Sequence, residues 1–252
     1  MIEGAKSLFY GLKMNNVLLT AVLVGGATIF GGGVGLLFST IGKRANDAML
    51  SFAAGVMLSA AIIGLILPSL EGGVAVCIIG IFLGALLVNL LDLPLPYLMK
   101  KRSFFDDKLR RVTLFVMAIA LHNLPEGIAA GVGLGSGDSS GALMIATAIA
   151  IQNIPEGIIV TVAMRGAGVG RTKAFLISGA TGVIEIFGTI LGYFAVGVSA
   201  ALLPLILSFA GGTMLYVISE EMIPETHSSG GRAPTYFLLL GFSFMLLLNA
   251  IL

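Results

Sequence analysis

Two segments of the chain repeat the same run of side chains that can bind metal ions. The first is HNLPEG at 122–127, and the second is QNIPEG at 152–157, 30 residues later. In a helix the leading polar residue and the glutamate of each segment are four positions apart. They therefore share one face, with Cβ atoms about 5–6 Å apart. A cation can bridge such a pair.

The proline inside each segment changes the backbone beside these ligands. Pro125 and Pro155 lack an N–H, and their rings clash with the carbonyl four residues back. We therefore expect bent helices in which the carbonyls of Leu121 and Ile151 are free for other partners. Within a bilayer such backbone is tolerated only where it is buried in protein or lines a cavity.

The two segments together offer one imidazole, two carboxylates and several amide oxygens. This mixture suits zinc, iron(II), manganese or cadmium, whereas magnesium alone would not need His122. One such segment could equally be a helix kink whose polar groups join neighbouring helices. The duplication, with two acids and a histidine at membrane depth, favours a metal site.

The elements that hold these segments must be membrane-spanning helices. Hydrophobic residues make up 57% of the 252 positions, charged residues make up 11%, and the mean hydropathy is +1.05. Eight apolar segments are long enough to cross a hydrocarbon core as helices, and no alternating pattern typical of a β-barrel is present. The sequence predicts an all-α integral membrane protein with spans at 17–41, 48–69, 73–97, 110–135, 141–164, 172–197, 202–224 and 233–252.

Charge placement predicts the orientation. With loops assigned alternately to the two sides, 12 of the 14 Lys and Arg residues fall on one side, and only Lys6 and Lys13 fall on the other. By the positive-inside rule both termini are extracytoplasmic in a multi-pass protein of the cell membrane. Cys77 is the only cysteine, so a thiolate metal cluster is excluded. A net charge of +1 argues against nucleic acid as a partner, and the lack of a P-loop pattern argues against nucleotide.

An internal repeat at an offset of 157 residues relates the two ends of the chain. SFAxGxML at 51–58 recurs at 208–215, and glycines near 25–35 recur near 182–192. Five spans separate the first two spans from the sixth and seventh, so the copies face opposite ways across the membrane. The pattern predicts a 3+2+3 inverted repeat with spans four and five inserted. Chance matches in an apolar alphabet, or glycines shared only for close helix packing, remain as alternatives.

These motifs resemble the ZIP family, the zinc- and iron-regulated transporter-like proteins, and particularly its bacterial branch. The resemblance covers the whole chain, 1–252, as a single transporter domain. It implies eight helices in a 3+2+3 arrangement, a homodimer in membrane lipid, and a two-metal site on helices four and five. It implies a carrier of divalent metal ions and neither an enzyme nor a protein with a bound cofactor.

The resemblance also assigns roles to individual residues. The core metal ligands are His122, Asn123, Glu126, Gln152, Asn153 and Glu156. Met57 is similar to a thioether ligand from helix two, and Glu185 is similar to a carboxylate from helix six. Asp47 resembles an acid near a pathway entrance, and Glu220 and Glu221 resemble ligands of the exit pathway.

Simpler interpretations stand beside these outer assignments. Met57 is also a plain core residue, because methionine fills irregular apolar space. Glu220 and Glu221 lie near a helix end and can be solvated there. Asp47 suits the first turn of span two, where a negative charge favours the helix N-terminus.

We therefore predict a secondary transporter that moves divalent metal ions, zinc foremost, toward the cytoplasm by alternating access. A proton- or sodium-coupled carrier of an organic solute is one alternative. An intramembrane metalloprotease is another, although the HExxH motif is missing from the chain.

Overall fold

The fold is described by a computed structural model over residues 2–92, 107–137, 139–198, 200–228 and 230–251. Every regular element within these ranges is helical. Eight helical segments are long and apolar enough to span a membrane, which confirms the all-α membrane class. They are Asn16–Gly35, Lys43–Gly72, Val74–Leu91, Val112–Gly135, Ser140–Gly166, Arg171–Gly197, Leu203–His227 and Ala233–Ile251.

Some expected ends were misplaced, and part of span three, residues 93–97, lies outside the described residues. The first helix, α1 (Ile2–Gly35), ends at Gly35, whereas the sequence pattern predicted that the first span continues to position 41. The carbonyl of Leu36 instead accepts hydrogen bonds from the side chains of Arg165 and Arg171, at 3.0 and 3.1 Å, and Arg165 also donates to the Phe38 carbonyl. Cationic side chains at a helix C-terminus satisfy its last carbonyls and fix where the helix stops.

Two spans are composite helices with a π-helical segment in the middle. Span two runs through α2 (Lys43–Ser59), η1 (Ala60–Ile66), α3 (Leu67–Ser69) and η2 (Leu70–Gly72). Span seven runs through α9 (Leu203–Val217), η4 (Ile218–Met222) and α10 (Ile223–His227), after the short η3 (Ala200–Leu202). The two π-helices, η1 and η4, lie at corresponding places under the offset of 157. Such segments re-aim side chains and occur frequently at functional sites.

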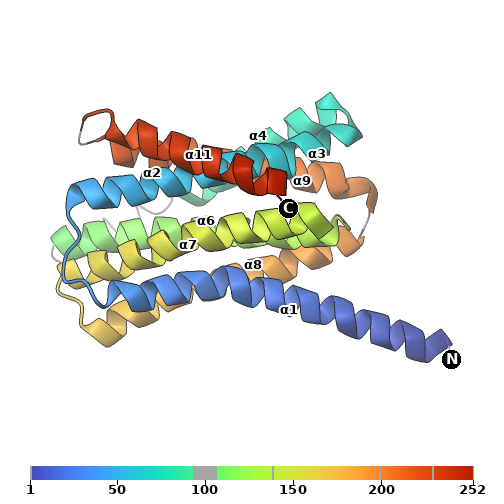
Figure 1. The fold of residues 1–252 in the computed structure, drawn as a ribbon, viewed down its shortest axis with the longest axis horizontal. Coiled ribbons are helices and arrows are strands. Elements are labelled where there is room, and N and C mark those ends of the chain that lie inside the picture. The colour runs from blue at the N-terminus through green and yellow to red at the C-terminus, as the bar shows by residue number, and fades with distance from the viewer. Residues whose placement is uncertain (1, 93–106, 138, 199, 229, 252) are drawn as a thin grey trace.

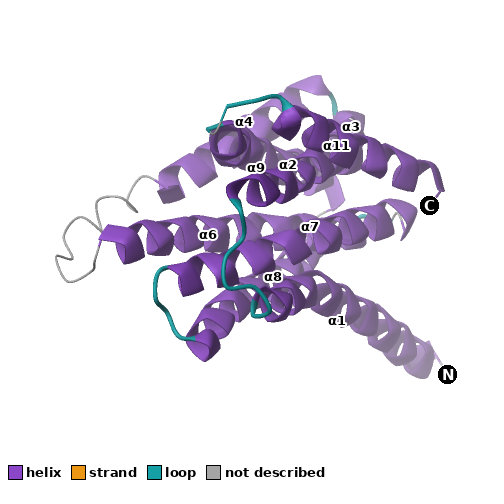
Figure 2. Cartoon of the chain, turned by 60° about the vertical axis from the view of Figure 1, so that its left-hand side comes forward, coloured by secondary structure: helices purple, strands orange, loops and turns teal. Residues whose placement is uncertain are grey.

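The spans form two four-helix groups. The site bundle consists of α1, α6 (Asp107–Gly135), α7 (Ser139–Gly166) and α8 (Arg171–Val198). The companion bundle consists of α2, α4 (Val74–Asp92), α9 and α11 (Ala233–Ile251). Both views show the bundles one above the other (Figures 1 and 2). They meet chiefly where α2 and η1 pack on α7 and where α6 packs on α9.

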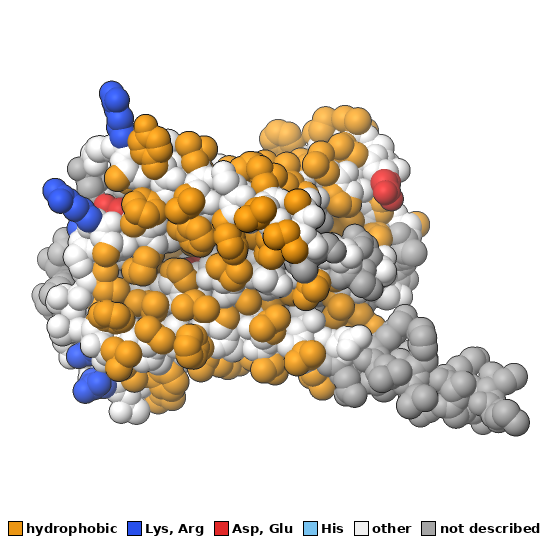
Figure 3. Space-filling view, viewed as in Figure 1, with side chains coloured by type: hydrophobic (Ala, Val, Ile, Leu, Met, Phe, Trp, Pro, Cys, Tyr) orange, Lys and Arg blue, Asp and Glu red, His pale blue; other side chains and the backbone are white. Residues whose placement is uncertain are grey.

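The outside of the molecule carries the pattern expected in lipid. An apolar belt covers the face drawn in Figure 3, and Lys and Arg side chains gather at one end of it. The helices α4 and α11 are the least buried of the eight spans. Their leucine, isoleucine and phenylalanine side chains therefore suit contact with acyl chains.

Within the companion bundle, glycines let helix backbones touch. A methyl group on Gly55 would overlap the carbonyl oxygen of Leu238, and one on Gly212 would overlap the carbonyl oxygen of Ile81. Gly84 lies in the same way against Phe209. The contact of Gly55 with Leu238 and the contact of Gly212 with Ile81 are equivalent under the offset: the two glycines are 157 residues apart, and so are their two partners. Small residues at such crossings allow the dispersion contacts that hold helices together in lipid.

Replacing these glycines should therefore destabilise the fold. We expect Gly55→Ala and Gly212→Ala each to lower the free energy of unfolding by about 1–3 kcal/mol or more, because the backbones must separate to admit the methyl group. Thermal unfolding in detergent measures this. Gly179→Ala is the matched control, since no atom lies within 4 Å of a methyl group there. Equal melting temperatures for all three variants would contradict the packing described.

Candidate metal-transport site

The two repeated segments lie in the middle of α6 and α7, at the centre of the molecule. Both helices continue without interruption across Pro125 and Pro155. Six polar side chains of these segments are buried, although they stand at membrane depth: His122, Asn123, Glu126, Gln152, Asn153 and Glu156. Their burial brings both segments into one polar centre.

The glycine that ends each segment brings a third helix against the site. A methyl group on Gly127 would overlap the carbonyl oxygen of Glu185 in α8, and one on Gly157 would overlap that of Thr28 in α1. Thr28 and Glu185 are 157 residues apart, so equivalent positions of the repeat pattern flank the two segments. The local sequence therefore sets how closely α1 and α8 approach the acids.

Glu185 is fully buried, and hydrogen bonds hold both of its carboxylate oxygens. Thr28 donates from Oγ1 to Oε2 at 3.0 Å, and Asn153 donates from Nδ2 to Oε1 at 2.5 Å. The same Asn153 amide group also donates to the carbonyl of Val24 at 3.0 Å. This acid thus ties α8 to both α1 and α7. Sequence reasoning had identified Glu185 but not the bond from Thr28, whose only signal was its place in the repeat.

His122 pairs with an acid of the other bundle. Its Nε2 lies 2.8 Å from Oε1 of Glu221, whose side chain is 31% exposed, while that of His122 is only 7% exposed. Glu221 belongs to η4, so this contact crosses from the site bundle to the companion bundle. In the described conformation a metal ion must compete with Glu221 for the imidazole.

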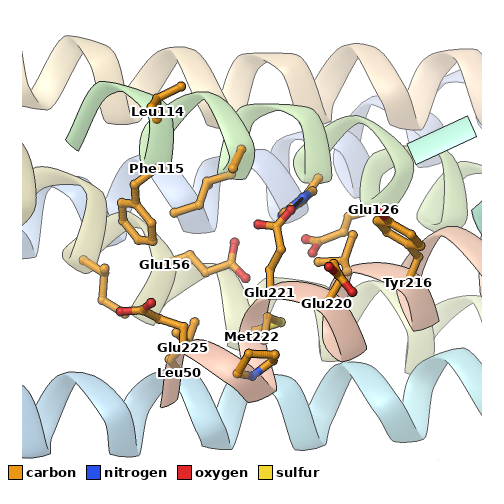
Figure 4. Close-up of a pocket in the computed structure, with 16 residues that line it drawn as sticks. Leu50, Leu114, Phe115, Glu126, Glu156, Tyr216, Glu220, Glu221, Met222 and Glu225 are labelled. Carbon is orange, nitrogen blue, oxygen red and sulfur yellow. Dashed lines mark ion pairs between the residues drawn. The ribbon is translucent and has the colours of Figure 1, made fainter. Parts of the chain in front are cut away.

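A cavity of about 620 Å³ lies where the two bundles meet. Its polar lining residues are His122, Glu126, Glu156, Tyr216, Glu220, Glu221 and Glu225. Figure 4 shows Leu114, Phe115 and Glu225 toward one end and Glu126, Glu220 and Tyr216 toward the other. The structure thus brings predicted ligands of α6 and α7 into one space with the two predicted exit-pathway acids.

We use the word mouth for the end of the cavity that is lined by Pro224 and Glu225, which lies toward the cationic end of the molecule; Glu220, toward the other end, is exposed as well. Pro224 and Glu225 line it and are exposed. They sit next to the end of α10, on the side where α2 begins with Lys43 and Arg44.

The remaining predicted residues lie away from the cavity wall. Asn123, Gln152, Asn153 and Glu185 are buried behind it. Met57 is fully buried in the main apolar cluster, as expected for a core residue.

Asp47 is also buried, but it is the fifth residue of α2. The first-turn interpretation of Asp47 was therefore wrong, because the helix begins at Lys43, five residues before the expected start.

Several buried amide atoms of the site have no protein partner among the described residues. Both side-chain polar atoms of Asn123 and the Oδ1 of Asn153 make no hydrogen bond there. Leaving such a group unsatisfied costs about 1–3 kcal/mol. The side-chain oxygens of Asn123 and Asn153 are therefore suited to bind a metal cation. Within the described ranges no three His, Cys, Asp or Glu side chains gather closely enough to hold one metal ion. An ion bound in this conformation would therefore need amide oxygens beside the carboxylates.

The fold and the site together define a class. Eight apolar helices enclose buried carboxylate, amide and imidazole groups, and the imidazole and several of the carboxylates line one cavity. This is the construction of a membrane transporter for cations.

Comparison with known proteins identifies the family within this class. Residues 99–249 match the family described as Zip, ZIP Zinc transporter. The chain is 34% identical over 246 residues to "Zinc transporter GufA" of Myxococcus xanthus, covering 92% of this chain and 97% of the relative. It is 38% identical over 262 residues to "Zinc transporter ZIPB" of Bordetella bronchiseptica, covering 94% of this chain and 83% of the relative. It is 30% identical over 344 residues to "Zinc transporter ZIP11" of Homo sapiens, covering 99% of each.

The chain belongs to the ZIP family. Members of this family are membrane transporters and not enzymes, so the metalloprotease alternative falls away.

The bond between Thr28 and Glu185 can be tested alone. We expect Thr28→Val to lower the free energy of unfolding by about 1–3 kcal/mol, because a fully buried carboxylate oxygen loses its donor. Thermal unfolding in detergent, without added metal, measures this. Thr189→Val is the control, since its hydroxyl bonds only to a backbone carbonyl within α8. A Thr28 variant as stable as this control would contradict the structural role of the bond.

Proposed function

We propose that this protein carries divalent metal ions, zinc foremost, across the cell membrane into the cytoplasm. One observation carries the proposal: His122, Glu126 and Glu156 line a single cavity that begins at membrane depth and reaches an exposed mouth. Two carboxylates balance the charge of a divalent ion, and the imidazole favours zinc and its neighbours over magnesium. The three relatives compared above are all named zinc transporters, which supports the same cargo.

The proposed centre holds two inequivalent metal positions. Glu126 and Glu156 bridge them, His122 supplies nitrogen on one side, and Gln152 supplies an amide in the matching place. Asn123 and Asn153 add side-chain oxygens, and Glu185 joins from α8. The hydrogen bonds that orient Glu185 support this, because ligating carboxylates are themselves held by partners.

The outer residues form the pathway in this proposal. Glu220 and Glu221 receive the ion on the way out, which their place in the cavity wall supports. Asp47, which the resemblance likened to an acid near a pathway entrance, is buried near the start of α2, at the end that this proposal makes cytoplasmic, so here it belongs to the exit side. Met57 offers its thioether from the companion bundle.

The inverted repeat underlies the transport cycle that we propose. The glycine approaches related by 157 residues, and the matching places of η1 and η4, support a 3+2+3 arrangement with α6 and α7 inserted. The division into two bundles supports movement of the site bundle against the companion bundle. Alternating access in this form exposes one site to each side in turn.

The orientation in this proposal places both termini outside the cytoplasm. The cavity mouth lies at the end that carries Lys43, Arg44, Arg165 and Arg171, and the positive-inside rule makes that end cytoplasmic. The described conformation is then open toward the cytoplasm. A homodimer, with membrane lipid around it, completes the proposal.

Uptake by reconstituted vesicles tests the function. We expect zinc or cadmium uptake by the wild type and a loss of more than about 10-fold in the double variant Glu126→Ala, Glu156→Ala, since removing even supporting groups costs metal sites 10–100-fold. Glu71→Ala, an exposed acid outside the site, is the control. Divalent ions should also raise the melting temperature of the wild type and the control but not of the double variant. Wild-type rates in the double variant would refute the site.

Labelling of introduced cysteines tests the orientation. We expect a membrane-impermeant maleimide to label Glu71→Cys in intact cells and Lys173→Cys only after the cells are permeabilised, in a Cys77→Ala background. Both positions are exposed and lie at opposite ends of the spans. The reverse pattern would place the termini in the cytoplasm and overturn the proposed direction.

A further inference from the structure

The cavity between the bundles has room and apolar wall that a metal ion does not use. Its volume of about 620 Å³ is far larger than one ion and is typical of pockets that bind small organic ligands. Such pockets combine mostly apolar walls with a few polar groups that fix the ligand. Leu50, Leu114, Phe115, Ile119 and Val217 line this cavity and offer no side-chain ligand to a metal. This part of the wall suits an occupant with an apolar body.

One face of α6 changes from apolar to polar along the cavity. Phe115, Ile119, His122 and Glu126 line it, and their spacing of four, three and four residues places them on one helical face. Phe115 and Glu126 are 11 residues apart, which corresponds to about 16 Å along the axis. Figure 4 shows Phe115 toward the mouth, Glu126 toward the other end and Glu156 between them. An elongated occupant therefore meets an aromatic ring near the mouth and carboxylates deeper inside.

The charge of the lining selects a cation as this occupant. Five glutamates line the cavity, and no Lys or Arg is among the described residues that line it. Glu126 is only 2% exposed, and its Oε2 has no hydrogen-bond partner within the described part of the chain. A buried carboxylate oxygen without a donor favours a ligand that brings N–H groups and positive charge.

An amidinium group matches this lining. It presents two parallel N–H groups, as a guanidinium does, and so can form a bidentate pair with a carboxylate. An aromatic body attached to it extends toward Phe115, where ring contacts add to the burial of apolar surface.

We propose that this cavity binds small organic cations with an aromatic body, represented by aryl amidines. The amidinium lies by Glu126 and Glu156, and the rings lie against Phe115 and Ile119. The bound ligand occupies carboxylates that the metal ion needs and fills the space between the bundles, so it blocks transport in the described conformation. The binding site depends on the cavity alone, whereas the block of transport rests on the proposed function.

Three probes separate the contribution of the charge from that of the aromatic body. 4-Phenylbenzamidine has both, 4-phenylbenzamide has the same body without the charge, and acetamidine has the charge without the body. We expect 4-phenylbenzamidine to raise the melting temperature of the purified protein and to inhibit zinc uptake by vesicles. The other two should need concentrations at least about 10-fold higher, because each lacks one set of contacts. Equal potency of 4-phenylbenzamide would overturn the proposal, since binding would then not depend on the cavity's acids.

Variants at the two ends of the ligand locate the site. Glu156→Gln removes charge at the head, and it should raise the dissociation constant of 4-phenylbenzamidine about 10-fold or more in calorimetric titration. Phe115→Ala should raise it about 2- to 10-fold through the loss of an aromatic contact. Because Phe115 also packs against two apolar clusters, Phe115→Leu, which keeps most of the volume, is measured beside it and should change the constant in the same direction.

Matched controls lie outside the cavity. Glu71→Gln changes an exposed acid, and Phe82→Ala removes a ring of α4 that is 72% exposed; neither residue lines the cavity. Both should keep the wild-type dissociation constant. An unchanged constant in Glu156→Gln, or in both Phe115 variants, would overturn the proposed site.

Failure of the proposed function would look different from failure of this inference. Wild-type vesicles that take up no metal contradict transport itself, and the dissociation constants then still decide whether the cavity binds organic cations. In vesicles that do take up zinc, saturation with 4-phenylbenzamidine should abolish uptake, and undiminished uptake at saturation would overturn the block.

Discussion

The structure depends on how it holds carboxylates inside a protein that lipid surrounds, and Glu185 is the clearest case because it is fully buried. Thr28 and Asn153 satisfy both of its oxygens, and they come from different helices. These bonds keep the carboxylate of Glu185 paired inside the protein, because an unpaired carboxylate in an apolar environment would cost free energy. They also tie α1, α7 and α8 together, so that the site bundle has a polar centre as well as apolar packing.

The cavity exists because this polar centre lies beside a second bundle with its own close packing. Glycines draw α2 to α11 and α4 to α9, which leaves α9 and η4 facing α6. The pair of His122 and Glu221 crosses the boundary between the bundles. One partner of this contact is partly solvated, whereas the other is buried in the site bundle.

The two halves of the chain differ most where the chemistry lies. Glu185 corresponds to Thr28, His122 corresponds to Gln152 at the shorter offset of 30, and Tyr216 corresponds to Ser59. The shared positions include glycines at which helix backbones approach closely, such as Gly55 and Gly212. The related positions thus carry unequal side chains, and this inequality leaves the polar centre with an imidazole at His122 and an amide at Gln152.

The sequence by itself determined the membrane class, the eight spans and the polar segments of α6 and α7, because hydrophobic length and repeated motifs are local properties of the chain. It did not determine that Glu221 takes the imidazole of His122, that Met57 lies in the apolar cluster, or that Asn89 donates a hydrogen bond to Tyr216. Those pairings join residues from 99 to 127 positions apart or depend on a whole core. Only the packing of helices decides them, since the rotation of each helix about its axis, which hydropathy does not encode, selects the side chains that meet.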